Sequence, residues 1–278
     1  MTLAVFALTA QESLLAVWLV ALGGAIGSFL NVVVYRVPAG MSLIQPGSHC
    51  PACKHLIRWH DNVPVLSWIV LGGRCRDCGA AISVRYLVVE AVSAALFLVL
   101  GLVEGLSLES AAAAAIVAYH LVLLCTLLAA GLIEGDQARL PWRLALPAAA
   151  VGAIAPLFGH YLRPVPALVA GGGPLAGLID GAAGLACGAA IGLGWWRLVG
   201  PARLRGLMIG PALTGLFLGW QAVAVLALAV MAVHAATRAL AIRWRWPDRV
   251  GPGLWWLAAD LAWILAREPL ARCWPLPA

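Results

Sequence analysis

The sequence predicts an all-α integral membrane protein of about eight transmembrane helices, with a small cytoplasmic zinc-ribbon-like domain between the first and second helices. Of its 278 residues, 63% are hydrophobic and 11% are charged, whereas a soluble domain carries about 25% charged residues. Several apolar stretches approach the roughly 20 residues that cross a bilayer. Four cysteines lie in the one long polar loop. These observations exclude a disordered chain and a disulfide-rich secreted scaffold, and they disfavour a soluble enzyme.

The candidate spans follow one another at short intervals along the chain. The stretch 207–240 is long for one span and short for two. A helical hairpin that turns near Gly219 and Trp220 explains it, with a first arm too short to cross the bilayer. The other expected spans are 13–35, 86–103, 110–133, 140–158, 175–198 and 253–265.

The basic residues favour the hairpin, because cytoplasmic loops of membrane proteins carry an excess of Lys and Arg. With a single span in its place, the loop 238–249 would move to the opposite face. With the hairpin, the loop 36–85 is cytoplasmic and both termini lie on the other side. The formal charge of +6 then reports orientation, and no nucleic-acid partner is expected. The hairpin puts 15 of the 18 Lys and Arg residues on one face, in loops 36–85, 139–143, 197–205 and 238–249.

The cysteines of the loop 36–85 have the spacing of a four-thiolate metal site. Cys50 and Cys53 form one Cys-x-x-Cys pair, and Cys75 and Cys78 form a second pair after 21 intervening residues. Each turn can present two thiolates to one zinc ion, and two turns complete a tetrahedron. The alternatives are four unrelated cysteines or two disulfides, and the reducing cytoplasm disfavours the disulfides. We expect a structural zinc, since four thiolates leave no open coordination position and a loop with little apolar core needs a metal to fold.

Residues 27–38, which read GSFLNVVVYRVP, lie in the first expected span and begin a series of recognisable segments. They resemble the first-span signature of the prepilin peptidases, which are also called type IV leader peptidases. The likeness is most specific within the first 90 residues. It extends beyond them and covers nearly the whole chain. The other matching segments, in the order of the family, are 50–53 (CPAC), 62–68 (NVPVLSW), 73–75 (GRC), 82–86 (ISVRY), 89–90 (VE), 177–181 (GLIDG), 218–221 (LGWQ) and 250–252 (VGP).

This resemblance implies an aspartic protease of the bacterial inner membrane. Such enzymes cleave the leader peptides of pilin or pseudopilin precursors at the cytoplasmic membrane face, for type IV pili or type II secretion. Many also N-methylate the new amino terminus with S-adenosylmethionine. The expected partners are therefore these precursors and the lipid bilayer. The expected cofactors are structural zinc and, from the resemblance alone, S-adenosylmethionine.

The residues that would carry proteolysis depart from the pattern of the family. An aspartic protease needs two carboxyl groups about 3 Å apart that share a proton. The first Asp of the family lies seven residues before the Pro of a Leu-Pro pair, and here that position, counted from Pro141, holds Glu134. Asp136 matches a second acidic position that some members have. The second Asp, in a Gly-x-Gly-Asp motif, corresponds to Leu207, and no Asp or Glu occurs between 181 and 247.

An apolar side chain cannot transfer a proton, so the resemblance predicts an incomplete dyad. Another carboxylate could complete a dyad with Glu134, and the candidates are Asp136, Glu90 and Asp61. Three functions follow: a peptidase with an unusual carboxylate pair, a non-proteolytic protein that binds pilin-like segments or assembly partners, and a surviving methyltransferase. The expected domains are a first transmembrane helix at 1–36, a zinc-binding domain at 37–85 and a peptidase-like helical domain at 86–278.

Overall fold

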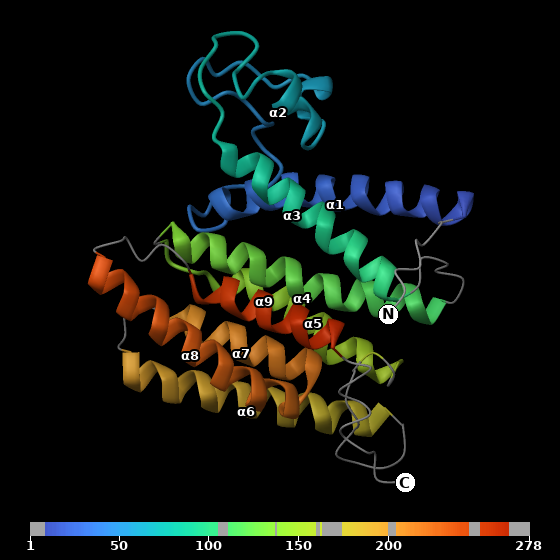
Figure 1. Cartoon of the computed structure of the whole chain (residues 1–278), viewed down its shortest axis with the longest axis vertical. Coiled ribbons are helices and arrows are strands. Elements are labelled where there is room, and N and C mark those ends of the chain that lie inside the picture. Colours follow the sequence, from blue (N-terminus) through green and yellow to red (C-terminus); the bar gives the residue numbers. More distant parts are fainter. Residues whose placement is uncertain are drawn as a thin grey trace. The chain divides into compact units, whose positions relative to one another are not determined.

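The computed structural model describes residues 9–104, 111–136, 138–159, 162, 174–199, 204–244 and 251–266. Within these ranges the regular structure is helical (Figure 1), and extended pairing is limited to the isolated bridges His49–Leu56 and Arg74–Ala81. The predicted all-α class is therefore confirmed. Parts of the Arg-containing loops 197–205 and 238–249 lie outside the described residues.

The apolar segments predicted to be spans all form helices where they are described. Five helices are long and apolar enough to cross a membrane, at least in part of their length: α1, α3, α4, α6 and α8. The remaining three, α5, α7 and α9, have 13 to 15 residues and reach only about 20–23 Å. The bounds are Ala10–Arg36 (α1), Val84–Val103 (α3), Ala111–Gly135 (α4), Trp142–Ile154 (α5), Pro174–Val199 (α6), Leu204–Leu218 (α7), Trp220–Trp244 (α8) and Pro252–Leu265 (α9).

The stretch 207–240 folds as the predicted hairpin. Its two arms are α7 and α8, and Gly219 alone separates them. Gly219 has a φ of 95°, which glycine adopts without steric cost. The turn therefore falls at the residue where the sequence placed it, and the 15-residue first arm is the short one.

The chain divides into two compact units, as far as it is described. Unit 1 comprises residues 1–33 and 42–117, and unit 2 comprises residues 34–41 and 118–278. Unit 1 contains the cysteine segment with two short helices, η1 (Trp59–Asn62) and α2 (Leu66–Val70).

In unit 1, α1 and α3 approach closely at two glycines of α1. A Cβ atom on Gly23 would lie 2.8 Å from the Cα of Ala94, and one on Gly27 would lie 2.7 Å from the Cα of Glu90. Only glycine allows this approach, as expected where small residues let membrane helices pack backbone against backbone.

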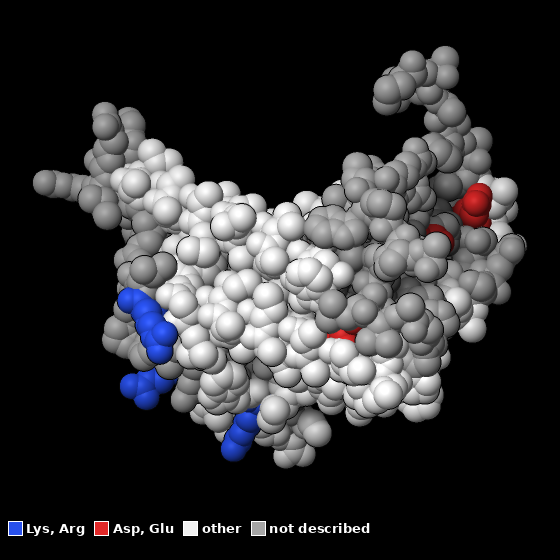
Figure 2. All heavy atoms as spheres, turned by 90° about the horizontal axis from the view of Figure 1, so that it is seen from below, with Lys and Arg blue, Asp and Glu red and all other residues white. Residues whose placement is uncertain are grey.

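In unit 2, α7 is the central helix and packs against α5, α6, α8 and α9. Its contact with α6 is closest, because Gly184 meets the backbone of Gly215 and Gly188 meets the backbone of Pro211. The side chains of α7 fill the core, with Thr214, Phe217 and Leu218 fully buried. On the face shown in Figure 2, most of the described surface belongs to residues other than Lys, Arg, Asp and Glu.

Candidate functional site

The two cysteine pairs occupy turns with the same backbone conformation. In the first turn the N–H of Lys54 donates to the carbonyl of Cys50, and in the second the N–H of Gly79 donates to the carbonyl of Cys75, both at 2.9 Å. Lys54 and Gly79 both have positive φ, 62° and 69°. The same local fold therefore occurs twice, once with glycine at the left-handed position and once with lysine.

These turns bring the four predicted ligands together. The Sγ atoms of Cys50, Cys53, Cys75 and Cys78 all lie within 4.8 Å of one another, and those of Cys50 and Cys78 are 3.8 Å apart. Zinc–sulfur bonds of about 2.3 Å in a tetrahedron require sulfurs about 3.8 Å apart. The donor set and its spacing therefore fit a zinc ion.

The thiols of the cluster differ in their affinity for protons. Backbone N–H groups of Cys53 and Ala52 lower the pKa of Cys50 to about 6. The amide of Ala80 lowers the pKa of Cys78, but burial and hydrogen bonding with the other thiols raise it, with a net result of about 12. A bound metal deprotonates its thiol ligands outright, so the difference between the two thiols is compatible with all four cysteines binding one ion as thiolates.

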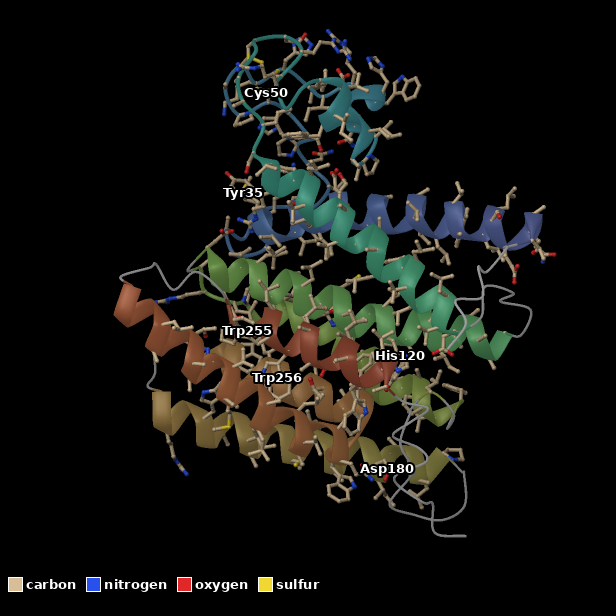
Figure 3. All side chains as sticks on the ribbon, viewed as in Figure 1. Tyr35, Cys50, His120, Asp180, Trp255 and Trp256 are labelled. Atoms are coloured by element: carbon tan, nitrogen blue, oxygen red, sulfur yellow. The ribbon has the colours of Figure 1, made fainter. Side chains whose placement is uncertain are left out.

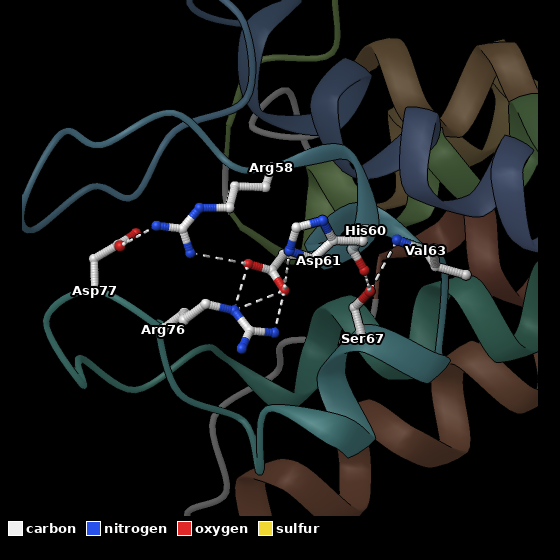
Figure 4. Close-up of polar contacts among 7 residues, drawn as sticks. All are labelled: Arg58, His60, Asp61, Val63, Ser67, Arg76 and Asp77. Atoms are coloured by element: carbon white, nitrogen blue, oxygen red, sulfur yellow. Dashed lines mark hydrogen bonds and ion pairs between the residues drawn. The ribbon is translucent and has the colours of Figure 1, made fainter.

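An ion-pair network holds the second cysteine turn against η1 (Figure 4). Arg76 donates to both carboxylate oxygens of Asp61, the shortest distance being 2.6 Å, and Arg58 donates to Asp77 at 2.9 Å. The side chain of Asp61 is 8% exposed, and its hydrogen bond with Arg76 holds its pKa below the usual range. Arg76 and Asp77 are the middle residues of the second turn, so these pairs fix its orientation.

Glu134, which the resemblance aligns with the first aspartate of the family, lies in the last turn of α4. Its Oε2 accepts a 2.8 Å hydrogen bond from the N–H of Gly253 in the first turn of α9. Pro252, the residue before Gly253, has no N–H. Glu134 therefore satisfies one of the free N–H groups that begin α9, where the helix dipole also favours a negative charge.

Three glycines make this junction of α4 and α9 possible. A Cβ atom on Gly251 would lie 2.5 Å from both the Cβ of Glu134 and the carbonyl oxygen of Gly131. A Cβ on Gly253 would lie 2.6 Å from the N of Gly131, and one on Gly131 would lie 2.6 Å from the N of Leu254. Gly251 and Pro252 belong to a segment that resembles the family, but the resemblance assigned them no role. The sequence signal that could have revealed the start of α9 was the Gly-Pro pair, because proline is frequent at the first position of a helix.

The other candidate acids have different surroundings. Asp136 is exposed just beyond α4, and Leu207 lies near the start of α7, where the structure describes its backbone. Glu90 is buried in α3 and accepts a 2.7 Å hydrogen bond from the N–H of Val65. Asp61 is bound to Arg76. The structure therefore gives Asp61, Glu90 and Glu134 each a hydrogen-bond donor within its own unit.

A buried polar pair that the sequence did not reveal links α7 to α9. The hydroxyl of Thr214 donates to Asp260 at 2.8 Å, and both side chains are fully buried. One turn earlier in each helix, Trp256 covers Gly210, where a Cβ atom has no room. Figure 3 shows Trp255 and Trp256 on α9 and Cys50 in the cysteine segment.

Comparison with known proteins places these features in one family. The model for the Bacterial Peptidase A24 N-terminal domain matches residues 21–103. A prepilin leader peptidase/N-methyltransferase of Klebsiella pneumoniae is 36% identical over 166 residues, which are 57% of this chain and 68% of that protein. No solved structure matches the chain.

Two further relatives carry the same name. That of Myxococcus xanthus is 52% identical over 84 residues, 30% of this chain and 25% of the relative. That of Dichelobacter nodosus is 37% identical over 167 residues, 50% of this chain and 55% of the relative. The matches thus span about a quarter and about half of these two relatives. With the likeness to the Klebsiella protein, the helical architecture and the cysteine cluster, the chain belongs to the family of prepilin leader peptidases.

Proposed function

We propose that this membrane protein binds the leader segments of pilin or pseudopilin precursors and does not hydrolyse them. The observation that carries the proposal is the register of α7 against α9. Gly210 meets Trp256 and Thr214 meets Asp260, so both pairs are separated by 46 positions. By the same offset, Leu207 stands at the level of Gly253, whose N–H is bonded to Glu134.

This register supports the identification of 134 and 207 as the positions of the family dyad, although they are 73 residues apart in sequence. One position holds a carboxylate and the other holds leucine. Hydrolysis by an aspartic protease needs one carboxylate to activate water and a second carboxyl group to donate a proton. The site therefore keeps the place of the dyad and lacks half of its chemistry.

In this proposal none of the other candidate acids provides the second carboxyl group of the dyad. Asp260 lies seven residues beyond Gly253 on α9, about 10 Å along the helix, and is bonded to Thr214. Asp61 and Glu90 are engaged by Arg76 and by the N–H of Val65. Asp136 follows Glu134 by two residues and is exposed.

The cysteine cluster has a structural role in the proposal. Cys50, Cys53, Cys75 and Cys78 hold one zinc ion, which supplies folding free energy to a segment with few buried apolar residues. We place this domain, 37–85, on the cytoplasmic side of the bacterial inner membrane, with 1–36 and 86–278 as the helical parts around it. Use of S-adenosylmethionine stays a prediction that rests on the names of the relatives.

The experiment compares cleavage with binding. The purified protein in detergent is incubated with a pilin precursor that an intact family member cleaves, and products and bound precursor are both measured. We expect binding without cleavage. Steady processing by the unaltered protein contradicts the proposal, and absence of binding contradicts its other half.

A paired variant tests the assignment of the dyad. Leu207→Asp combined with Glu134→Asp restores two carboxyl groups at the two positions, and we expect measurable cleavage. Leu207→Asn combined with Glu134→Asp is the matched control, since asparagine has the same shape and cannot take part in proton transfer as a carboxyl group does. Cleavage by the control as well as by the double-aspartate variant would contradict the assignment.

A further inference from the structure

The segment between η1 and α2 contacts α1 near its midpoint and contacts α3 within its first third. A Cβ atom on Gly24 would lie 3.2 Å from the Cβ of Pro64. Gly24 precedes Arg36, the end of α1, by twelve residues, or about 18 Å along the helix axis. The contact between Val65 and Glu90 is six residues, or about 9 Å, beyond the start of α3.

These contacts lie at the depth of the hydrocarbon core. Helix α1 has 27 residues and is about 40 Å long, so Gly24 is next to its midpoint. A bilayer core of about 30 Å that contains the apolar part of α1 also contains Gly24 and Pro64. Figure 1 shows α2 over the middle of α1.

The side chains that α2 exposes suit this depth. Leu66, Ile69 and Val70 are 61%, 58% and 78% exposed, and no charged residue occurs between 62 and 73. A contiguous apolar face of this kind on a soluble segment marks an interaction site. Both α1 and α3 are candidate membrane spans, and lipid acyl chains would surround the middle of helices that cross a bilayer.

The backbone of the segment is also adapted to a medium without water. The N–H of Val65 donates to Glu90, and the N–H of Val63 donates to the hydroxyl of Ser67 at 2.8 Å. That hydroxyl donates in turn to the carbonyl of His60, at 3.0 Å. Hydrocarbon tolerates non-helical backbone only where its polar groups are satisfied within the protein, and here side chains satisfy them.

The turn at Val65 is strained, which shows that its surroundings hold it in place. Val65 has a φ of 63°, and the N–H of Leu66 donates to the carbonyl of Pro64 at 2.6 Å. This is a γ-turn with positive φ at a β-branched residue, a rare and costly conformation. The bond to Glu90 and the packing on Gly24 fix the point where the chain reverses.

We propose that residues 64–70 form a re-entrant segment that enters the bilayer beside α1 and α3, with acyl chains covering Leu66, Ile69 and Val70. The cysteine domain is then anchored in the membrane by its own apolar helix as well as by the flanking spans. This inference is independent of whether the protein cleaves a precursor.

The test uses the whole protein in vesicles of phosphatidylethanolamine and phosphatidylglycerol that contain a lipid with a diazirine in its acyl chain. After irradiation, mass spectrometry locates the adducts. We expect adducts on Leu66, Ile69 and Val70 to exceed those on Ile44 and Leu56 by about tenfold, since hydrocarbon reaches only the former. Ile44 and Leu56 are the internal controls, because they are apolar, at least as exposed as Leu66 and Ile69, and close in sequence to the first cysteine pair.

Hydroxyl radicals generated in the water phase give the complementary measurement, and we expect them to oxidise Ile44 and Leu56 in preference to α2. Oxidation of α2 to the same extent as the controls, without acyl-chain adducts, would overturn the proposal. So would labelling of α2 by a photoreactive pilin-like peptide in the absence of lipid adducts, because the face would then be a peptide-docking site.

A variant pair tests the role of Glu90 in positioning the segment. Glu90→Ala removes the acceptor for the N–H of Val65, and we expect acyl-chain labelling of α2 to fall several-fold while the zinc content is unchanged. Glu90→Gln keeps an acceptor oxygen and should keep the labelling. Equal labelling in both variants contradicts this role, and the labelling pattern of the unaltered protein tests insertion even if Glu90→Ala fails to fold.

Discussion

The carboxylate of Glu134 and the backbone N–H of Gly253 are joined by a 2.8 Å hydrogen bond that links the end of α4 to the start of α9. The two residues are 119 positions apart in the chain. The acid that the family resemblance assigns to the position of the first aspartate is thus also a support for a neighbouring helix. Substitutions at Glu134 should therefore change stability as well as chemistry.

Glu134→Ala should lower the free energy of unfolding by about 1–2 kcal/mol, because it removes a charged acceptor from the first turn of α9. Glu134→Gln keeps the acceptor and loses only the charge, so its cost should be smaller. Thermal unfolding in detergent, followed by circular dichroism, compares the two. A loss from Glu134→Gln as large as that from Glu134→Ala would mean that the hydrogen bond contributes little.

Gly251→Ala should destabilise the junction of α4 and α9 by about 1–3 kcal/mol, because the new methyl group would overlap the side chain of Glu134 and the backbone of Gly131. Gly194→Ala is the matched control, since a Cβ atom there meets nothing within 4 Å. In the interior of α6 alanine is favoured over glycine by about 1 kcal/mol. The same unfolding measurement should give opposite signs for the two variants.

Lys54→Gly should strengthen zinc binding, because lysine has a φ of 62° in the first cysteine turn and that conformation costs an L-residue about 1 kcal/mol. Folding of the site and zinc binding are coupled, so this energy corresponds to about fivefold in the zinc dissociation constant. Gly79→Lys, at the same place in the second turn, should weaken binding by a similar factor. Competition with a chromogenic chelator measures both, and a change of the same sign in both variants would refute the explanation.

Asp61→Asn should speed the removal of zinc by a chelator, because it breaks the ion pair that orients the second cysteine turn. The pKa of Asp61 is lowered below its ordinary value of 3.8 by Arg76. The stabilisation by the Asp61–Arg76 ion pair is therefore complete above pH 3.8, and it is lost only as the pH falls through the lowered pKa of the folded protein. The rate of zinc release from the Asp61→Asn variant, divided by the rate from the unaltered protein, should thus be constant from about pH 6 to pH 8.

Asp77→Asn is the control for this measurement, because Asp77 pairs with Arg58 at a more exposed position. Its effect on zinc release should be smaller than that of Asp61→Asn, since exposed ion pairs contribute little. A ratio for Asp61→Asn that drifts across this range would show that a different group controls release.

Length and apolar content sufficed to predict the helices, because a chain in a bilayer must satisfy its backbone within each span. The turn at Gly219 followed from the length of the stretch 207–240 and from the distribution of the Lys and Arg residues. The meeting of the four cysteines followed from the Cys-x-x-Cys spacing. The bond from Glu134 to Gly253 could not be predicted in this way. An acidic residue just before Leu140–Pro141 is equally compatible with a solvated loop, and its partner is remote in sequence.

The same reason applies to Val65 and Glu90 and to Thr214 and Asp260. Each pair joins segments whose register the sequence does not specify, and neither pair forms a motif with fixed spacing. The short helix α2 was not predicted within the loop 36–85, since five residues are too few for a periodic pattern. What the sequence did provide was a run without charge, which the structure places beside the middle of α1.

The direct backbone contacts of Gly184 with Gly215 and of Gly188 with Pro211 have a dynamic consequence. With no side chains at these contacts, sliding of α6 along α7 would bring larger side chains into them, so we expect the two helices to move together. A displacement of α7 would then be absorbed where α7 meets α5, α8 and α9.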